Sequence, residues 1–401
     1  MRGAANPSSL ERGLTIIIPA YNEEEAIDLI VQRCLAAREP IAKEANLDAV
    51  RVVVVDDGSR DRTYERAKQY VPEITLLQHE RNKGYGAAIK YGFCESSTEL
   101  VGFLDADGTC DPLFFSRLCQ EQKKGNYDVV LGNRMGAQSE IPAIRRLGNM
   151  IFATLLGVLS HTLIQDTASG MRVIKKTSLP RLYPLPDGLH FTPAMSSRVL
   201  FHPELTLSEV EMPYAERIGE SKLSVIKDGV RFLRVILEMA LIYRPLLFFG
   251  AASLLLFLAC LIYAPGLMLG LWKSRYLAED RIFRFLGVIT FFVGGLTLMT
   301  AGMLTQKLVA HLHDYRHKNT KIINAFFLWL SPVGVVSLLL GVGINIAPLR
   351  EYLLSGEITH HPWTFIAVGA FLVLTGIQIL AISALNFVID LVTRHRSENE
   401  Q

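Results

Sequence analysis

Two different patterns of apolar positions divide the chain near residue 244. Before this point short apolar runs alternate with charged segments, and after it long uncharged runs dominate. Four of these runs are long enough to cross a bilayer, which takes about 20 apolar residues. They cover residues 245–271, 285–306, 322–349 and 362–389. We therefore predict a soluble domain over residues 1–223 and a membrane domain of four transmembrane helices over residues 245–401.

The segment between these domains, residues 224–244, has the pattern of an amphipathic helix. One set of apolar side chains recurs at helical spacing: Ile226, Val230, Leu233 and Leu237. The opposite face is charged and carries Lys227, Arg231, Arg234 and Glu238. Basic residues at headgroup depth, directly before a span, favour a helix in the membrane interface. The alternative is an ordinary amphipathic helix packed on the soluble domain.

The first half of the chain predicts strands that alternate with helices. The strands are expected at residues 14–19, 50–55, 74–77, 100–104 and 129–132. Helices are expected after Asn22 as an N-cap, from about Arg62, and over residues 84–93. This alternation predicts an α/β fold with a mostly parallel, doubly wound sheet. Ligands of such sheets bind beyond the carboxyl ends of the strands, where Tyr21, Asp57 and Asp105 stand.

Asp105-Ala106-Asp107 is the sharpest local signal for chemistry. These two carboxylates follow the apolar run VGFL, a predicted strand that holds them rigidly. Hard cations such as Mg²⁺ take oxygen ligands, and Mg²⁺ usually completes its shell with substrate phosphates and water. The pair therefore predicts a site for Mg²⁺ or Mn²⁺ that neutralises a departing diphosphate.

Two common nucleotide-binding motifs are absent from the sequence. There is no G-x-G-x-x-G after the first strand and no G-x-x-x-x-G-K-[ST], which disfavours a dinucleotide oxidoreductase and a P-loop NTPase. The segment NKGYG, residues 82–86, is instead a glycine-rich helix entrance with a lysine. Lys83 either approaches a nucleotide or stands in a tight turn, and both interpretations stay open.

Two further polar segments offer candidate groups. Asp166 lies in a polar loop beside Arg172, either as a base or positioning group or as an ion-paired cap. Residues 216–222 place a glycine between the cations Arg217 and Lys222 next to the membrane half. This second pattern favours a loop that closes over anionic phosphates rather than a plain linker.

Charge and cysteine content add little to this picture. The formal net charge of +2 points to no class of partner, and no nucleic acid is expected to bind. The five cysteines fit neither a zinc motif nor a disulfide framework, which favours reduced thiols in a cytosolic fold. The first residues lack an apolar signal-peptide core, and basic residues cluster on one side of the spans. We expect a multi-pass membrane protein with a cytoplasmic first domain and both termini in the cytoplasm.

Taken in order, these segments resemble the family 2 glycosyltransferases, and within them the polyisoprenyl-phosphate glycosyltransferases of the dolichol-phosphate-mannose synthase-like group. The segments that carry the resemblance are IIIPAYNEEE (16–25), VVDDGSRDRT (54–63), NKGYGAA (82–88), FLDADG (103–108), GNR (132–134), DTASGMR (166–172) and RIGESK (217–222). The resemblance implies a Rossmann-like GT-A fold. It also implies inverting transfer of one sugar from a UDP- or GDP-hexose to polyprenyl or dolichyl phosphate.

The resemblance further implies roles for individual residues. Donor binding would fall to Pro19, Tyr21, Glu23, Asp57, Lys83, Asp105, Ala106, Arg217 and Lys222. The metal would be held by Asp105 and Asp107, which with Asp166 would form the catalytic set. The acceptor phosphate would meet Arg134, Arg145, Arg146 and Ser169. Relatives often have Leu-Gln where this chain has Gly108 and Thr109, so the third metal ligand stays open.

Two other functions stand as alternatives, and a homo-oligomer stays open. A processive polysaccharide synthase would use the spans as a polymer channel, and such enzymes carry a Gln-x-x-Arg-Trp motif. Here the tryptophans Trp272, Trp329 and Trp363 all lie in the membrane half, which argues against it. A transporter or scaffold with a degenerate transferase domain is disfavoured by the intact acidic motifs and by the few ionisable residues in the spans.

Overall fold

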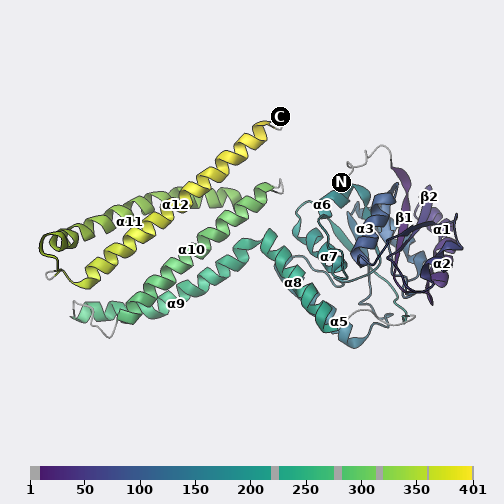
Figure 1. Ribbon diagram of the computed structural model, residues 1–401, viewed down its shortest axis with the longest axis horizontal. Coiled ribbons are helices and arrows are strands. Elements are labelled where there is room, and N and C mark those ends of the chain that lie inside the picture. Colours follow the sequence, from purple (N-terminus) through teal and green to yellow (C-terminus); the bar gives the residue numbers. More distant parts are fainter. Residues whose placement is uncertain (1–9, 218–224, 275–281, 313–318, 359–360, 400–401) are drawn as a thin grey trace. The chain divides into compact units, whose positions relative to one another are not determined.

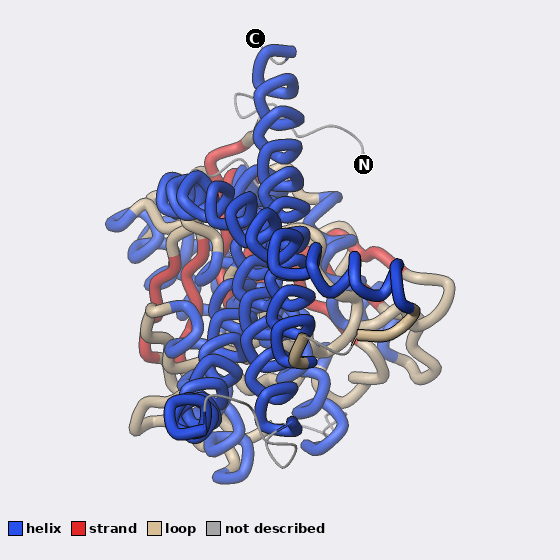
Figure 2. The backbone as a smooth tube through the Cα atoms, turned by 90° about the vertical axis from the view of Figure 1, so that its left-hand side faces the viewer, coloured by secondary structure: helices blue, strands red, loops and turns tan. Residues whose placement is uncertain are grey.

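The computed structural model describes residues 10–217, 225–274, 282–312, 319–358 and 361–399. It divides into two compact units, Met1–Ala240 and Leu241–Gln401. The first unit contains a sheet covered by helices, whereas the regular elements of the described part of the second unit are all helices (Figure 1). Figure 2 colours the helices blue and the strands red. This division follows the change in apolar pattern along the sequence.

A seven-stranded sheet forms the centre of the first unit. Its strands are β1 (Glu11–Ala20), β2 (Ala49–Asp56), β3 (Thr75–Gln78), β4 (Thr98–Phe103), β5 (Val129–Asn133), β6 (Arg172–Lys175) and β7 (Leu207–Glu211). Their order in space is β3-β2-β1-β4-β6-β5-β7. Among these strands β6 alone runs antiparallel to its neighbours, so the predicted mostly parallel α/β sheet is confirmed. β6 and β7 have no counterpart among the predicted strands.

Helices cover both faces of this sheet. The helices of four residues or more in the first unit are α1 (Ile27–Glu44), α2 (Thr63–Lys68), α3 (Tyr85–Glu95), α4 (Phe115–Gly125), α5 (Ala143–Ser160), α6 (Leu179–Leu182), α7 (Phe191–Phe201) and α8 (Val225–Tyr243). On β1, Leu14, Ile16 and Ile18 pack with α1 and α4 on one face. Ile17 points to the other face, where α3 and α7 pack. Burial on both faces explains why the central strands are continuous apolar runs.

Asn22 does not cap the first helix, which corrects the sequence prediction. α1 begins at Ile27, after Ala26, and has no side-chain cap. Asn22 instead adopts a left-handed backbone conformation with φ of 52°, which asparagine tolerates better than most residues. Its side-chain Oδ1 accepts the N–H of Arg60 at 2.8 Å, and its own N–H donates to Ser59 Oγ at 2.9 Å. Asn22 therefore ties the loop after β1 to the loop after β2.

Helices α5 and α8 lie side by side at one edge of the first unit (Figure 1). Phe152 of α5 and Phe232 of α8 meet edge to face with ring centroids 6.0 Å apart. The buried face of α8 carries Phe232, Val235, Ile236 and Ala240. Three residues of the predicted apolar stripe, Val230, Leu233 and Leu237, are exposed instead. α8 thus packs on the first unit, as the second alternative expects, and a position in the membrane interface stays a prediction.

The second unit contains α9 (Pro245–Ser274), α10 (Ile282–Leu312), α11 (Asn319–Ser355) and α12 (Trp363–Asn399). The first three predicted spans fall within α9, α10 and α11, and the fourth, 362–389, begins one residue before α12. Together with α5, they make five helices in the described part of the chain that are long and apolar enough to cross a membrane. By its length and composition, the chain has the features of a multi-pass membrane protein.

A buried lysine joins three helices of the second unit. Lys307 of α10 is fully buried. Its Nζ lies 2.7 Å from Asn324 Oδ1 on α11, and 2.7 Å from both Asn386 Oδ1 and Asp390 Oδ1 on α12. The sequence pattern does not reveal this cluster, because Lys307 directly follows the predicted span and its partners are distant in sequence.

Candidate active site

A cleft of about 520 Å³ opens in the first unit at the carboxyl ends of β1, β2 and β4. Its wall contains most of the residues that the sequence nominates: Pro19, Tyr21, Glu23, Asp57, Asp105, Ala106, Asp107, Arg134, Arg145 and Arg217. This is where an open α/β sheet binds its ligands, because the loops that follow parallel strands converge at one edge.

Asp105 and Asp107 follow β4 in the chain. Neighbouring groups orient their carboxylates. Thr109 donates to Asp107 Oδ1 from its hydroxyl at 2.7 Å and from its N–H at 3.2 Å. The Tyr85 hydroxyl donates to Asp105 Oδ1 at 2.7 Å. Burial, and then the charge of Asp107, raise the pKa of Asp105 to about 7. The raised pKa shows that two carboxylates held close together disfavour a second negative charge.

The two aspartates fit a divalent cation by their chemistry. Both offer carboxylate oxygens, which hard cations prefer, and a cation would relieve the crowding of charge. Within the described residues, no cluster of three or more His, Cys, Asp or Glu side chains forms a complete metal site. Thr109, at the position left open for a third ligand, directs its hydroxyl to Asp107. The remaining ligands would therefore come from a diphosphate and water.

Arg217 reaches this acidic pair across the cleft. Its Nη2 donates to Glu23 Oε1 at 3.0 Å, and its Nη1 lies 3.5 Å from Asp107 Oδ2. The backbone before it is held beside the aspartates, because the Ala215 N–H donates to the Thr109 carbonyl at 3.0 Å. A cation is therefore fixed next to the predicted metal ligands.

Asp57 directly follows β2 in the chain and is held in place by a tight turn. Its carboxylate accepts the N–H groups of Lys83 and Gly84 at 2.9 and 2.8 Å, and His79 Nδ1 lies 2.7 Å away. Gly84 has φ of 106° and packs against the Asp187 carbonyl, so a side chain would not fit there. The Lys83 side chain is exposed and outside the cleft wall. The tight turn explains why a glycine stands in this segment. A contact between Lys83 and a nucleotide-sugar donor stays a prediction.

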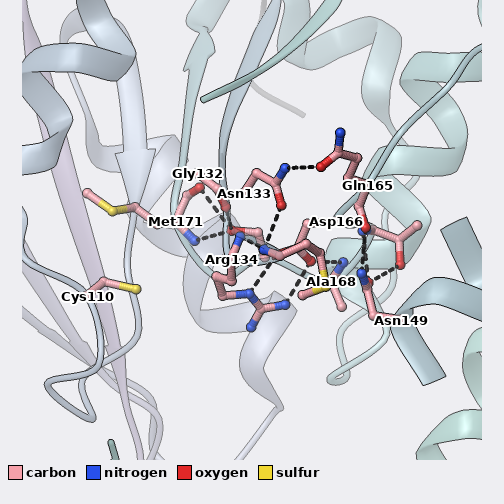
Figure 3. A network of polar contacts seen from close by, with 12 residues as sticks. Cys110, Gly132, Asn133, Arg134, Asn149, Gln165, Asp166, Ala168 and Met171 are labelled. Carbon is pink, nitrogen blue, oxygen red and sulfur yellow. Dashed lines mark hydrogen bonds and ion pairs between the residues drawn. The ribbon is translucent and has the colours of Figure 1, made fainter. Parts of the chain in front are cut away.

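Arg134 and Asp166 form a buried two-pronged ion pair (Figure 3). Arg134 donates from Nε to Asp166 Oδ2 at 2.7 Å, from Nη2 to Oδ1 at 2.8 Å, and from its backbone N–H to Oδ2 at 3.0 Å. Burial disfavours charge on Asp166, but Arg134 outweighs it and lowers the pKa of Asp166. This geometry favours Asp166 as a group that positions Arg134 rather than as a base.

The loop that carries Asp166 is braced from two sides. Glu209 of β7 accepts two backbone N–H groups of the loop at 2.9 Å each. Arg172, fully buried in β6, donates to two of the loop carbonyls at 3.0 Å. At the end of the loop, Gly170 packs so closely against Asp105 that a Cβ would overlap the carboxylate. The loop therefore packs directly against the carboxylate of Asp105.

The residues nominated for the acceptor phosphate separate into two groups. Arg134 and Arg145 line the cleft. Arg146 donates to the Met135 carbonyl and Ser169 to the Gly132 carbonyl, and neither belongs to the cleft wall. Of the adjacent arginines, Arg145 is the better placed to meet a phosphate. Lys222 lies outside the described residues, so its role stays a prediction.

Several residues of the site are absent from the predicted set. Tyr85 and Thr109 orient the aspartates, and Tyr214 lies under Arg134 with its ring centroid 5.3 Å from the guanidinium carbon. Tyr85 lies within the motif NKGYGAA and Thr109 directly follows FLDADG, which was a usable signal. Tyr214 belongs to no motif, and no local pattern marks it.

The wall that α5 and α8 contribute to the cleft mixes apolar with polar side chains. Ile144 and Phe152 of α5 and Phe232 of α8 line it, with Ile141 just before α5. The same two helices also bring Arg145, Asn149 and Arg231 to the wall, and the carboxylates line the part at the strand ends. The cleft therefore combines a surface suited to a charged diphosphate with one suited to a hydrocarbon chain.

Comparisons with known proteins find a family and several relatives similar to part of this chain. Residues 15–182 match the family model described as glycosyl transferase family 2, and this segment includes Asp105, Asp107, Arg134 and Asp166. A dolichyl-phosphate hexose transferase of Haloferax volcanii is 29% identical over 234 residues, covering 57% of this chain and 94% of the relative. A dolichyl-phosphate beta-glucosyltransferase of Trichomonas vaginalis is 28% identical over 250 residues, covering 57% and 71%.

A solved structure is also similar to part of the chain. Glucosyl-3-phosphoglycerate synthase from Mycobacterium tuberculosis, in complex with Mn²⁺, uridine diphosphate and phosphoglyceric acid, is 19% identical, with a TM-score of 0.44. The match covers 60% of this chain and 84% of that one. The family model and the two relatives, together with the predicted motifs, lead to one conclusion. The chain is a glycosyltransferase that carries a glycosyl transferase family 2 domain over residues 15–182, and it is similar to transferases that are named for a dolichyl-phosphate acceptor.

Proposed function

We propose that the chain transfers a single sugar from a nucleotide-sugar donor, a UDP- or GDP-hexose, to polyprenyl or dolichyl phosphate. Transfer occurs at the cytoplasmic face of a membrane, with inversion and with Mg²⁺ or Mn²⁺. The observation that carries the proposal is that one cleft combines the charged groups Asp105, Asp107 and Arg217 with apolar side chains of α5 and α8. The names of both relatives include a dolichyl phosphate, which supports the same class of acceptor.

The donor side of the cleft supports binding of a nucleoside diphosphate. Asp57 closes a turn beside the cleft, and its rigid carboxylate is suited to accept hydrogen bonds from a nucleobase. Arg217 supplies a planar guanidinium, which suits two-pronged contact with phosphate oxygens. A metal held by Asp105 and Asp107 would neutralise the charge of the departing diphosphate.

The acceptor side supports a phosphate carried by a lipid. Arg134 and Arg145 line the cleft together with apolar side chains of α5 and α8. A lipid monophosphate has a second pKa near 6, by analogy with phosphorylated side chains, so it is largely dianionic at pH 7. Such a nucleophile does not depend on a base, which agrees with the burial of Asp166 behind Arg134.

The reaction is a single displacement. A phosphate oxygen of the lipid forms a bond to the anomeric carbon of the sugar, while the bond from that carbon to the diphosphate oxygen breaks. The bonding electron pair leaves with the nucleoside diphosphate. One displacement inverts the anomeric configuration. The chief task of the protein is to hold two anions together, which explains the gathering of cations at the cleft.

Exposed apolar residues support delivery of the acceptor from a membrane. On α5 they are Ile144, Leu147, Met150, Ile151 and Val158. On α8 they are Val230, Leu233 and Leu237. Exposed apolar residues gathered on two adjacent helices are typical of membrane contact, and basic residues of α8 such as Arg234 suit anionic headgroups. Both helices also line the cleft, so a lipid phosphate would enter without leaving the bilayer surface.

Product analysis tests this proposal. The full chain in lipid vesicles is given polyprenyl phosphate and, one at a time, a panel of labelled nucleotide sugars. The expected product is a lipid that carries one sugar, identified by mass, with the opposite anomeric configuration to the donor. Asp107→Ala is expected to abolish transfer, whereas Asp48→Ala, an exposed acid before β2, keeps it. A polymeric product would favour a processive synthase, and no transfer with any donor would favour a scaffold.

A further inference from the structure

We propose that Arg217 is a placeholder cation, which neutralises Asp107 while the cleft holds no ligand and turns to the diphosphate when metal and nucleotide arrive. This makes the binding of metal and nucleotide cooperative. The inference rests on the proposed function and adds an order of events to it: the empty enzyme disfavours a free divalent ion and accepts one together with the donor.

The contacts of Asp107 leave one of its oxygens for a cation. Asp107 Oδ1 accepts two hydrogen bonds from Thr109. Oδ2 faces Arg217 Nη1 at 3.5 Å. A metal at this carboxylate would therefore meet the guanidinium at close range, and two cations on one oxygen repel each other.

Arg217 is also incompletely bonded where it stands. Its Nη2 donates to Glu23 Oε1 at 3.0 Å, but its Nε is buried and has no hydrogen-bond partner among the described residues. A buried donor without an acceptor is unfavourable, and native structures rarely keep one without a reason. The oxygens of a diphosphate would satisfy this group, which points to a ligand that completes the site.

The surroundings allow Arg217 to change partners without a change of fold. The backbone is tied to the aspartate turn at Ala215, two residues earlier. The side chain is about a quarter exposed, at 23%, and it reaches into the cleft. Arg134, the neighbouring cation, is held by Asp166 and is not in contact with Asp107 in this arrangement. Arg217 is thus the group placed to exchange a carboxylate for a phosphate.

Cooperativity follows from this exchange. When a diphosphate draws Arg217 away, Asp107 Oδ2 becomes available and the affinity for metal rises. By thermodynamic linkage the metal raises the affinity for the nucleotide by the same factor. Removing the guanidinium should therefore strengthen the binding of free metal and weaken the binding of nucleotide, which are opposite effects from one substitution.

Binding of Mn²⁺ alone tests the inference without any turnover. The full chain in detergent is titrated with Mn²⁺ and followed by electron paramagnetic resonance, with and without uridine or guanosine diphosphate. Arg217→Gln is compared with wild type, with Arg217→Lys, and with Arg62→Gln, an exposed arginine at the N-terminal end of α2, as the control. We expect Arg217→Gln to bind free Mn²⁺ roughly 5-fold tighter than wild type or more, which is the lower end of typical coupling factors. We also expect the nucleoside diphosphate to increase the Mn²⁺ affinity of this variant much less than that of wild type.

The outcomes separate the inference from the proposed function. If Asp107→Ala loses Mn²⁺ binding but Arg217→Gln and Arg217→Lys bind free Mn²⁺ no tighter than wild type, the placeholder role is wrong and the metal site stands. If Asp107→Ala binds Mn²⁺ as wild type does, the metal site itself is wrong and the inference falls with it. Arg217→Lys keeps a positive charge, so we expect its affinity for free Mn²⁺ to lie between those of wild type and Arg217→Gln. This second variant keeps the test valid if Arg217→Gln does not fold.

Discussion

The hydroxyl of Tyr85, at the start of α3, donates a 2.7 Å hydrogen bond to Asp105 Oδ1 in the turn that follows β4. On the other side of the same carboxylate, Gly170 packs against Oδ2. Both oxygens of Asp105 are therefore fixed by residues from other segments. Since Asp105 is one of the two proposed metal ligands, this orientation determines where a metal would lie.

Replacement of Tyr85 by phenylalanine removes the hydrogen bond but keeps the ring. A hydrogen bond to a charged group contributes about 1.5–3 kcal/mol, so kcat/KM for sugar transfer should fall roughly 10- to 100-fold. Tyr91→Phe, whose ring stacks on His79, is the matched control and should keep its activity. Equal activity of Tyr85→Phe and wild type would show that Asp105 does not depend on this contact.

An alanine at position 170 should disable the acidic pair. A Cβ there would overlap the Asp105 carboxylate, which must then rotate away from its present position. We expect Gly170→Ala to lose Mn²⁺ affinity and transfer activity together. Gly157→Ala in α5 serves as the control, because its Cβ would meet other atoms no closer than 3.5 Å. Normal Mn²⁺ binding by Gly170→Ala would contradict the arrangement described.

The Arg134–Asp166 pair should make stability depend on pH. Arg134 lowers the pKa of Asp166 despite its burial, so the pair stabilises the fold above the unfolded pKa of about 3.9 and loses this contribution as the pH falls through the folded value. At pH 7, Asp166→Asn leaves a buried guanidinium unpaired and should destabilise the protein by about 3–5 kcal/mol.

Thermal unfolding at several pH values measures this effect. The difference in stability between wild type and Asp166→Asn should be largest near neutral pH and should shrink below about pH 4. A difference that stays constant across this range would mean that the charge of Asp166 is not what holds Arg134.

Sequence reasoning succeeded where the pattern is local. β1, β2 and β4 are buried on both faces, so each is a continuous apolar run, and the acids that follow them line one cleft as predicted. It failed for Asn22, because an asparagine before a series of glutamates looks like an N-cap although its left-handed backbone serves a turn. It also missed β6 and β7, which are short and have no continuous apolar run.

Long-range partners were beyond the reach of the sequence. Asp166 stands near Arg172 in the chain, yet its ion pair forms with Arg134, which lies 32 residues away. Likewise Arg217 meets Glu23 across 194 residues. Nothing in local spacing indicates such pairs, since the sheet topology alone brings the loops together. The order of the motifs pointed to the family, whereas the contacts between the residues of the site could be found only in the structure.

Lys307 should be essential to the second unit. Its ion pair with Asp390 and its contacts to Asn324 and Asn386 are enclosed by α10, α11 and α12. Lys307→Met leaves these polar groups without their donor and should lower the melting temperature in detergent, whereas Lys321→Met, an exposed lysine on α11, should not. If both variants melted alike, the lysine would add nothing to helix packing.

The most direct test is metal-dependent transfer of labelled sugar to polyprenyl phosphate in vesicles, measured before and after chelation. The account predicts that a chelator stops formation of the lipid-linked sugar, that added Mn²⁺ or Mg²⁺ restores it, and that Asp107→Ala is not restored by either ion. Undiminished transfer in the chelated wild type, or metal-restored transfer in Asp107→Ala, would contradict the role assigned to the two aspartates.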